Sequence, residues 1–494
     1  MIFSRSCRSW TGLAVAVGFA IAGAAADDPT CEGAWGSLLA GRTEQAAEEF
    51  ATLAASQPLD GCAAEGRVVA LIDLRRWREA LDEARGFHER APQDSRVVSA
   101  LGEALYRAGE LPEVRERLAP LAMADDVPAS ALTLLGLISV AEGEAGEAVE
   151  WMDRAVATAP DDRRVIYRAS EAVENRGEAA RRLERYLELS EGDDPDRIEG
   201  ARGRLRMLKA LGDRQVWVAE SRPDRVELPL QLVAVPGGGL LGAVVKVSVG
   251  EKGKPVRLLL DSGSSGLFLV ERMARKRGFE EVSVETAFGG GGDKRHVSPR
   301  GIFSTFGVGE LLFRDALAST TTVEFDPTGR YHGVLGLSVF DGYRVTIDLA
   351  RGKLVLERTD ERIEGQRYWT VSGQMLVRAA ARDGQQAMFL FDTGATGSVL
   401  DLAYVEGAPG AELDQDANLR GYGGSIRQAY LVRGTRLTFQ GLDSGEGVLR
   451  ATDLSLRSHL GGVQLAGFLG LDVLGGRRVV VDTVGRTVRV EPAR

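Results

Sequence analysis

The chain has 494 residues, of which 44% are hydrophobic and 27% charged, and its formal net charge is −10. This length exceeds what one hydrophobic core can organise, so it predicts two or three domains. The acidic balance is spread along the chain and argues against nucleic acid as a partner, and no internal apolar run is long enough to span a membrane.

Residues 1–26 have the pattern of a secretory signal peptide. Arg5 and Arg8 provide a basic start, Trp10–Ile21 is a short apolar core, and Ala22–Ala26 offers an Ala-x-Ala cleavage site. An uncleaved anchor is the less favoured interpretation, because this apolar core is shorter than a bilayer span. We therefore expect an exported protein, periplasmic or secreted.

Removal of the signal segment would leave two cysteines, Cys31 and Cys62. In an oxidising compartment these cysteines can pair as a disulfide, and two buried free thiols are the alternative. The chain has only four His and no Cys-x-x-Cys, so a zinc site has almost no support. We expect neither a metal nor a cofactor.

Residues 27–211 contain an internal repeat. Glycines recur at multiples of 34 residues, at Gly41, Gly109, Gly143 and Gly177. Proline closes three of the units, at Pro58, Pro92 and Pro160. This pattern resembles the tetratricopeptide repeat, a pair of antiparallel helices that cross at small residues. We expect about five units and a closing helix near Ile198–Leu211.

Solenoids of this kind present a concave surface that often binds a peptide or a partner protein. A spacer or a folding scaffold is the alternative, and the repeat pattern does not separate the two. After the repeats, residues 212–225 lose helical periodicity and predict a linker. From Val226 onward, short β-branched runs separated by glycine predict an all-β region.

Two stretches of the β region share one pattern. Leu258–Leu267 reads LLLDSGSSGL, and Phe389–Ser398 reads FLFDTGATGS. An apolar run that ends in Asp is typical of a buried strand that brings one carboxylate to the end of a sheet, and the glycine lets the backbone turn sharply. One such copy is an ordinary turn sequence. Two copies predict that Asp261 and Asp392 meet in space.

The repeated stretch lies within a larger duplication. A hairpin precedes each Asp strand, and a Gly-rich segment follows each, at Gly289–Gly292 and Gly421–Gly424. Further on, Gly333–Glu357 (GVLGLSVFDGYRVTIDLARGKLVLE) matches Gly467–Glu491 (GFLGLDVLGGRRVVVDTVGRTVRVE). The chain therefore holds two related β units, 226–360 and 361–494.

These elements, in this order and twice, resemble retropepsin-type aspartic proteases fused in tandem. The resemblance implies an all-β domain of two pseudo-symmetric lobes, with the Asp loops meeting where the lobes join. Pepsin is also bilobal, but it has longer lobes and one flap. Here both units are compact and both carry a Gly-rich segment, so the tandem retropepsin is favoured.

The resemblance also implies roles for individual residues. Asp261 and Asp392 would share one proton and activate a water between them, with no covalent intermediate. The loop residues that would tie the two loops together or allow their close approach are Ser262, Gly263, Thr393 and Gly394. The candidate flap residues are Gly290, Gly291, Tyr422 and Gly423. Asp348 and Asp482 are interpreted as turn carboxylates.

The resulting hypothesis is an aspartic endopeptidase that cleaves peptide or protein substrates, with the helical repeats binding or positioning a protein. The alternative is a non-catalytic adaptor that binds peptides through the repeats and a protease-like β domain. Loss of either Asp, or of the glycine that follows it, would favour the adaptor. Both pairs are present.

Overall fold

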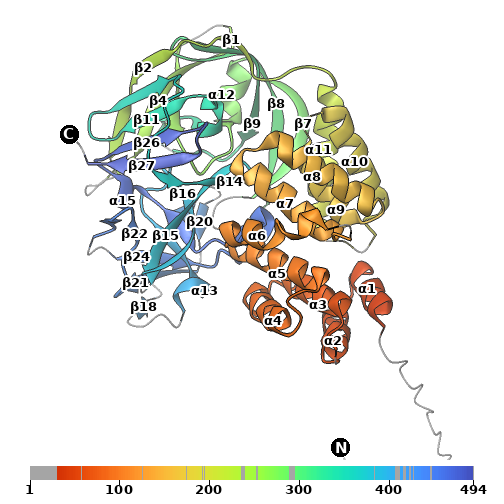
Figure 1. Ribbon diagram of the computed structural model, residues 1–494. Coiled ribbons are helices and arrows are strands. Elements are labelled where there is room, and N and C mark those ends of the chain that lie inside the picture. Colours follow the sequence, from red (N-terminus) through yellow and green to blue (C-terminus); the bar gives the residue numbers. More distant parts are fainter. Residues whose placement is uncertain are drawn as a thin grey trace, which may run out of the picture.

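The computed structural model describes residues 30–492 except 57, 125, 174, 192, 194, 235–239, 252–253, 289–294, 327, 383, 407–411, 415–418, 422–423, 427 and 446–447. The expected signal segment, 1–26, lies outside the described residues. An all-helical part is followed by a part made mainly of β-strands, and the two lie side by side (Figure 1).

The described residues between 31 and 211 form five consecutive helix pairs and a closing helix, which confirms the tetratricopeptide-like architecture. The pairs and the closing helix are α1 (Cys31–Leu39) with α2 (Thr43–Ala54), α3 (Gly61–Asp73) with α4 (Trp77–Arg90), α5 (Ser95–Ala108) with α6 (Leu111–Leu118), α7 (Ala129–Glu142) with α8 (Ala145–Thr158), α9 (Arg163–Ala172) with α10 (Arg176–Glu188), and α11 (Pro195–Leu211). A 3-10 turn, η1 (Leu121–Met123), follows α6.

Small residues let neighbouring helices approach closely, both between units and within a unit. A Cβ on Gly66 would lie 2.2 Å from the Phe50 ring, and one on Gly136 would lie 2.8 Å from the Met152 methyl carbon. Aspartate side chains cap α3, α5 and α9, where Asp60, Asp94 and Asp162 accept hydrogen bonds from the first backbone amides. The period in the sequence therefore records both the helix crossings and the helix starts.

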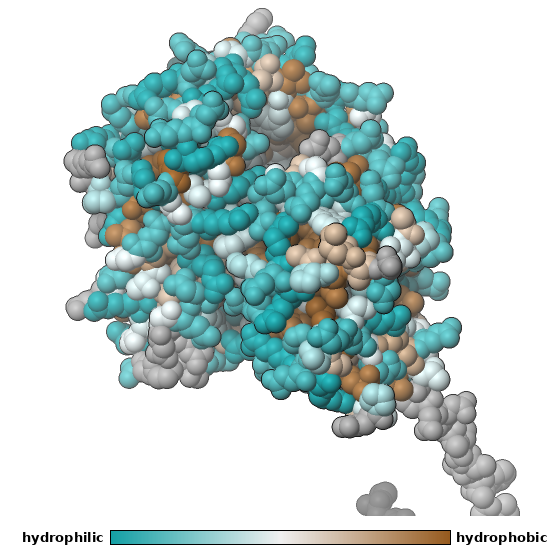
Figure 2. All heavy atoms as spheres, viewed as in Figure 1, coloured by the Kyte–Doolittle hydropathy of each residue, from teal (hydrophilic) through white to brown (hydrophobic). Residues whose placement is uncertain are grey.

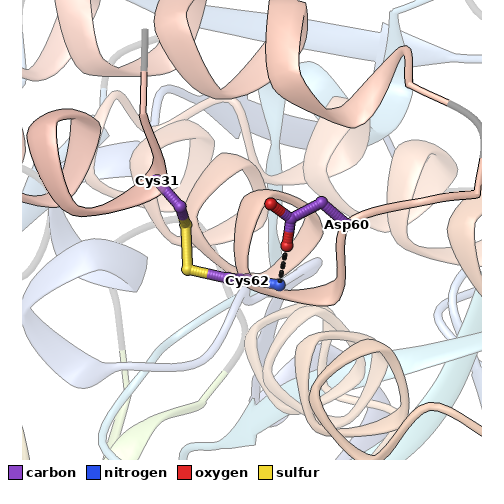
Figure 3. A group of neighbouring side chains, drawn as sticks. All are labelled: Cys31, Asp60 and Cys62. Carbon is purple, nitrogen blue, oxygen red and sulfur yellow. Dashed lines mark hydrogen bonds between the residues drawn. A yellow bond between two sulfur atoms is a disulfide. The ribbon is translucent and has the colours of Figure 1, made fainter.

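A disulfide joins Cys31 at the start of α1 to Cys62 at the start of α3 (Figure 3). Beside it, Asp60 accepts a hydrogen bond from the Cys62 backbone amide at 2.9 Å. Donor atoms of the three residues lie within 4.8 Å of one another. The two sulfurs bond to each other, so neither is a thiolate that could bind a metal.

The first lobe is built on a nine-stranded sheet, in the order β1-β9-β6-β10-β5-β4-β8-β7 with β3 paired to β4. Its strands are β1 (Val218–Ser221), β3 (Gln231–Ala234), β4 (Leu240–Val249), β5 (Val256–Leu260), β6 (Leu267–Val270), β7 (Glu280–Phe288), β8 (Arg295–Val308), β9 (Leu311–Thr321) and β10 (Gly333–Leu335). Two short helices accompany them, α12 (Glu271–Lys276) and η2 (Leu337–Phe340).

The second lobe is built on a ten-stranded sheet, in the order β18-β21-β24-β17-β25-β16-β15-β22-β23 with β14 paired to β15. Its strands are β14 (Trp369–Val371), β15 (Gln374–Arg382), β16 (Gln385–Phe391), β17 (Val399–Asp401), β18 (Glu412–Asp414), β21 (Ala429–Arg433), β22 (Thr438–Phe439), β23 (Leu442–Asp443), β24 (Leu449–Thr452) and β25 (Gly467–Leu469). A separate pair is formed by β19 (Leu419–Gly421) and β20 (Gly424–Ile426), and the short helices are α13 (Leu402–Val405), α14 (Ser455–Gly461) and α15 (Leu471–Leu474).

A six-stranded sheet joins the lobes, in the order β13-β27-β26-β11-β12-β2. Its strands are β2 (Arg225–Pro229), β11 (Arg344–Asp348), β12 (Lys353–Glu357), β13 (Gln366–Arg367), β26 (Arg478–Asp482) and β27 (Thr487–Glu491). At its centre β11 and β26 run antiparallel, so Arg344 lies opposite Asp482 and Asp348 opposite Arg478. The duplicated hairpins predicted from sequence therefore pair with each other.

Strand structure begins earlier than expected. Within the segment predicted to be a linker, β1 pairs antiparallel with β9 of the first lobe. Just before β1, the Trp217 ring packs edge-on against Phe306 and Phe313, at centroid distances of 5.5 and 5.4 Å. The edge of β9 and this aromatic contact order the segment, and neither can be read from local composition.

The helical part packs against both lobes (Figure 1). On the second lobe, the Arg107 guanidinium donates to the Gly462 carbonyl at 3.1 Å, and the core of the repeats continues into Trp369 and Leu376. On the first lobe, Arg206 of α11 donates to the Val284 carbonyl at 3.3 Å. Among the described residues, no helix is both long and apolar enough to cross a membrane.

Candidate active site

The two Asp residues stand at equivalent ends of two buried strands. Asp261 follows β5, which pairs in parallel with β10, and Asp392 follows β16, which pairs in parallel with β25. The Asp261 amide donates to the Leu335 carbonyl and the Asp392 amide to the Leu469 carbonyl, both at 3.0 Å. The apolar runs form the strands because both of their faces are covered. Each carboxylate is therefore held by the same backbone geometry.

The residues after the two Asp bind each other's loops. The Ser262 amide donates to Thr393 Oγ1 at 3.1 Å, and the Thr393 amide donates to Ser262 Oγ at 3.0 Å. Each hydroxyl then donates across the interface, Ser262 to the Phe391 carbonyl at 2.7 Å and Thr393 to the Leu260 carbonyl at 3.0 Å. Four buried hydrogen bonds thus fix the two loops against each other.

The two loop glycines let the carboxylates approach. A Cβ on Gly263 would lie 2.8 Å from the Asp392 carboxyl carbon, and a Cβ on Gly394 would lie 2.6 Å from that of Asp261. Each carboxylate also accepts a hydrogen bond from the glycine amide of its own loop, at 2.9 Å for Gly263 and 2.8 Å for Gly394. The structure therefore brings Asp261, Asp392 and the four predicted support residues together.

The carboxylates are electrostatically coupled. The pKa of Asp261 is raised well above its usual value, and burial is the largest cause. The neighbouring charge of Asp392 and a hydrogen bond to Asp392 raise it further. Burial also raises the pKa of Asp392, although the Gly394 amide acts in the opposite direction. Two adjacent carboxylates that resist ionising together hold one proton between them. Such a pair can act as a general acid and a general base at once.

An arginine missed by the sequence reasoning lies near the pair. Arg457 belongs to the short helix α14 of the second lobe and is half-buried. Its charge opposes the rise in the pKa of both Asp261 and Asp392, and burial lowers its own pKa. No motif marks this residue, because its place follows from the packing of α14 and not from a pattern along the chain.

The candidate flap residues Gly290, Gly291, Tyr422 and Gly423 lie outside the described residues. The strands that flank them are described: β7 pairs with β8 up to Phe288 and Arg295, and β19 pairs with β20 up to Gly421 and Gly424.

Asp348 and Asp482 hold turns in the six-stranded sheet. Asp348 accepts hydrogen bonds from the amides of Ala350 and Arg351, at 3.1 and 2.8 Å. Asp482 accepts the equivalent bonds from Val484 and Gly485, at 3.0 and 2.8 Å. These bonds stabilise the two turns, so both carboxylates have a structural role.

A cavity of about 1600 Å³ lies between the inner face of the helices and the second lobe. Its wall includes Ser372 and Gly373 of the β14–β15 hairpin and Leu460 of α14. The same hairpin touches an Asp loop, because Gln374 Nε2 donates to the Gly263 carbonyl at 2.7 Å. Figure 2 shows hydrophobic residues gathered over α5, α7 and α9, which supply much of the helical wall.

Comparison with known proteins agrees with this geometry. Residues 245–339, which include Asp261, match the family model described as aspartyl protease. This segment of the chain is similar to that family. That match does not extend to Asp392, and no curated protein matches the chain.

Solved structures resemble each part separately. The aspartic proteinase of Irpex lacteus is 16% identical with a TM-score of 0.37, over 55% of this chain and 97% of its own. A thermophilic tetratricopeptide repeat protein of Thermus thermophilus is 20% identical with a TM-score of 0.29, over 35% of this chain and 95% of its own. A tetratricopeptide repeat protein of Parabacteroides merdae is 11% identical with a TM-score of 0.26, over 36% of this chain and 70% of its own.

Proposed function

We propose that the protein is an aspartic endopeptidase whose catalytic pair is Asp261 and Asp392. The observation that carries the proposal is the reciprocal packing of the two loops, in which the glycine of each loop lies against the carboxylate of the other. Two carboxylates that repel each other are costly to hold together, and a pair that shares one proton can supply both the acid and the base for hydrolysis of an amide.

The proposed mechanism uses one shared proton. The ionised member of the pair takes a proton from a water molecule as the water attacks the carbonyl carbon of the peptide bond. The protonated member donates its proton to the carbonyl oxygen. Collapse of the tetrahedral intermediate then breaks the C–N bond, with a proton transferred to the leaving amine. The four interloop hydrogen bonds keep the carboxylates aligned throughout.

The helical repeats would hold the part of a protein substrate that lies away from the cleaved bond. Two features support this role: the inner face of the helices lines the large cavity, and the cavity wall includes the hairpin that touches the Gly263 loop. We further propose that the protein acts after export. The amino-terminal pattern and the Cys31–Cys62 disulfide both suit an oxidising compartment.

The proposal is tested by replacing each Asp with Asn. We expect Asp261→Asn and Asp392→Asn each to abolish cleavage of a mixed peptide library, because neither variant can share a proton. Asp348→Asn is the matched control, since Asn can still accept the two turn hydrogen bonds. Cleavage products are measured by mass spectrometry, with and without a statine-type inhibitor.

Wild-type turnover in either dyad variant would refute the catalytic assignment. Peptide binding by the wild-type protein without any inhibitor-sensitive cleavage would favour the adaptor alternative.

A further inference from the structure

The inner helices α3, α5 and α7 carry a row of polar side chains on one wall of the cavity. Glu65, Ser99 and Ser130 belong to these three helices in turn, and all three residues line the cavity. The helices follow one another along the helical part (Figure 1). Glu65 and Ser99 are one repeat period apart, so they occupy the same position in successive units. The row therefore runs across the units on their inner face.

Hydrogen bonds join this row in one direction. Ser130 Oγ donates to Glu65 Oε1 at 2.6 Å, and the Oγ atoms of Ser99 and Ser130 lie 2.7 Å apart. A hydroxyl has one proton to donate. Ser130 donates its proton to Glu65, so Ser99 must donate to Ser130. Both hydroxyls therefore donate toward the carboxylate, an arrangement that stabilises its ionised form.

The Glu65 carboxylate has no cation of its own among the described residues, where Ser130 is its one hydrogen-bond partner. Other acidic residues of the inner helices differ in this respect. Glu103 pairs with Arg168, and Asp73 pairs with Arg164. Glu65 is thus a half-buried carboxylate that lines the cavity and lacks the partner that its neighbours have.

The charges around Glu65 agree with this geometry. Burial raises the pKa of Glu65, whereas the Ser130 hydrogen bond and the charge of Arg96 act in the opposite direction. Arg96 is exposed at the start of α5 and forms no ion pair with Glu65. A half-buried carboxylate without a cation is costly, and a positive group that entered the cavity would offset this cost.

We infer that Glu65 binds a positively charged group of a peptide that lies in the cavity. This inference rests on the proposed function, since it gives the chemical class of the substrate segment that the repeats hold. Val69 lies one turn after Glu65 on α3, is half-buried and lines the cavity. It can pack against the aliphatic stem of a basic side chain while Glu65 binds the charged end. The positive group has two sources, a Lys or Arg side chain and the free amino end of the peptide.

The test measures peptide binding to the full-length Asp261→Asn/Asp392→Asn variant, which cannot cleave the probes by the proposed mechanism. The probes are libraries of short peptides with a dye at the carboxyl end. Three have acetylated amino ends and differ only in a central Lys, Gln or Glu, and a fourth has a central Gln and a free amino end. We expect fluorescence anisotropy to show about 10-fold tighter binding of a positively charged library than of the acetylated Gln library, the usual effect of a charge-assisted hydrogen bond.

Glu65→Gln, added to this variant, should bring that ratio close to one. Gln keeps an oxygen that accepts the Ser130 hydrogen bond, so the change removes the charge and retains the contact. Glu65→Asp keeps the charge and should restore part of the ratio. Glu89→Gln is the matched control and should leave the ratio unchanged, because Glu89 is an exposed residue of α4 and does not line the cavity. Thermal unfolding of each variant shows that it is folded.

Preference for the Lys library that Glu65→Gln removes supports a basic side chain as the ligand, and the same result with the free amino end supports the peptide terminus. Equal binding of all libraries would overturn the inference, as would a preference that persists in Glu65→Gln. Cleavage by the wild-type protein is measured separately, so either of these results leaves the protease standing. Charge-selective binding that depends on Glu65, without inhibitor-sensitive cleavage by the wild-type protein, would support the inference and overturn the protease.

Discussion

At the scale of single residues, the catalytic pair is held by main-chain amides. Gly263 and Gly394 donate to the carboxylates of their own loops, and the Arg457 cation acts from beyond ion-pair distance. Hydrogen bonds and a distant cation lower a carboxyl pKa, but burial and repulsion raise it more in this pair. Both pKa directions therefore favour a pair that retains one proton.

This retained proton predicts a dependence of stability on pH. Because the folded pKa of each Asp is raised above the usual value of 3.8, the folded protein binds the proton more tightly than the unfolded chain. The resulting stabilisation is complete below about pH 4 and is lost as the pH rises through the raised pKa values of the folded protein. We expect the wild-type unfolding temperature to fall across this window relative to that of the double variant Asp261→Asn/Asp392→Asn. The unfolding temperatures are measured by differential scanning calorimetry. If they change with pH in the same way in both proteins, the raised pKa values of the pair are contradicted.

A second prediction concerns the close approach of the loops. In Gly394→Ala, the new methyl group would lie 2.6 Å from the Asp261 carboxyl carbon, so the carboxylate must move. A displacement of about 1 Å can reduce turnover about 100-fold, and we expect a loss of that size. Gly397→Ala on the same loop is the control, because its nearest neighbour would be Arg450 Nη1 at 3.8 Å. Peptide turnover is measured for both variants. Equal turnover would mean that the site tolerates the displacement of the Asp261 carboxylate.

Much of the site can be predicted from the sequence at this scale, because a strand that ends in Asp-Ser-Gly or Asp-Thr-Gly is a local pattern and the chain repeats it. The fit of each glycine to the opposite carboxylate follows once the two strands are known to meet. Arg457 could not be found in this way. Its position depends on how α14 packs after β24, and an arginine in a short helix is ordinarily a solvated surface residue.

At the scale of elements, the two Asp loops form one unit because Ser262 and Thr393 exchange hydrogen bonds. Thr393→Val keeps the shape of the side chain but removes a hydroxyl that accepts one buried bond and donates another. We expect it to lower the free energy of unfolding by about 1–3 kcal/mol, because the Ser262 amide loses its partner. Thr393→Ser keeps the hydroxyl and should stay close to the wild type. Urea unfolding monitored by Trp fluorescence measures the free energy of unfolding of both variants. Equal stability of Thr393→Val and the wild type would contradict the role assigned to this hydroxyl.

The helices and the duplicated strands could be predicted because their signals repeat along the chain. The period of 34 residues follows from helix crossings at small residues such as Gly102 and Gly136, so it indicates the fold directly. Strand β1 gave no comparable signal. Its four residues are ordered by β9 and by the packing of Trp217, which are contacts between segments far apart in sequence.

At the scale of the whole molecule, the helices and the lobes share contacts that hold the cavity in shape. Glu110 of the repeats pairs with Arg378 of the second lobe at 2.9 Å, and α11 contacts the first lobe through Arg206. The Cys31–Cys62 disulfide lies at the other end of the helical part and ties its first two units together.

The disulfide should stabilise the helical part by constraining its unfolded state. Its cysteines are 31 residues apart, and a loop of this size corresponds to about 3–4 kcal/mol. We therefore expect Cys31→Ser/Cys62→Ser to unfold at a lower urea concentration when helix content is followed by circular dichroism. Wild-type protein treated with a reductant should behave like the double variant. An unchanged midpoint would show that the loop is already restrained by the packing of α1 on α3.

The two lobes are alike at the catalytic loops but differ beside them. Helix α14 lies between β24 and β25 of the second lobe, whereas the described residues between β9 and β10 of the first lobe form no helix. A site made from two identical chains presents the same surface to both ends of a peptide, so either orientation fits equally. Here the two sides differ, because helix α14 belongs to the second lobe and the first has no equivalent among the described residues. The difference between the lobes therefore gives the cleft a direction, and a substrate should be cut in one N-to-C orientation.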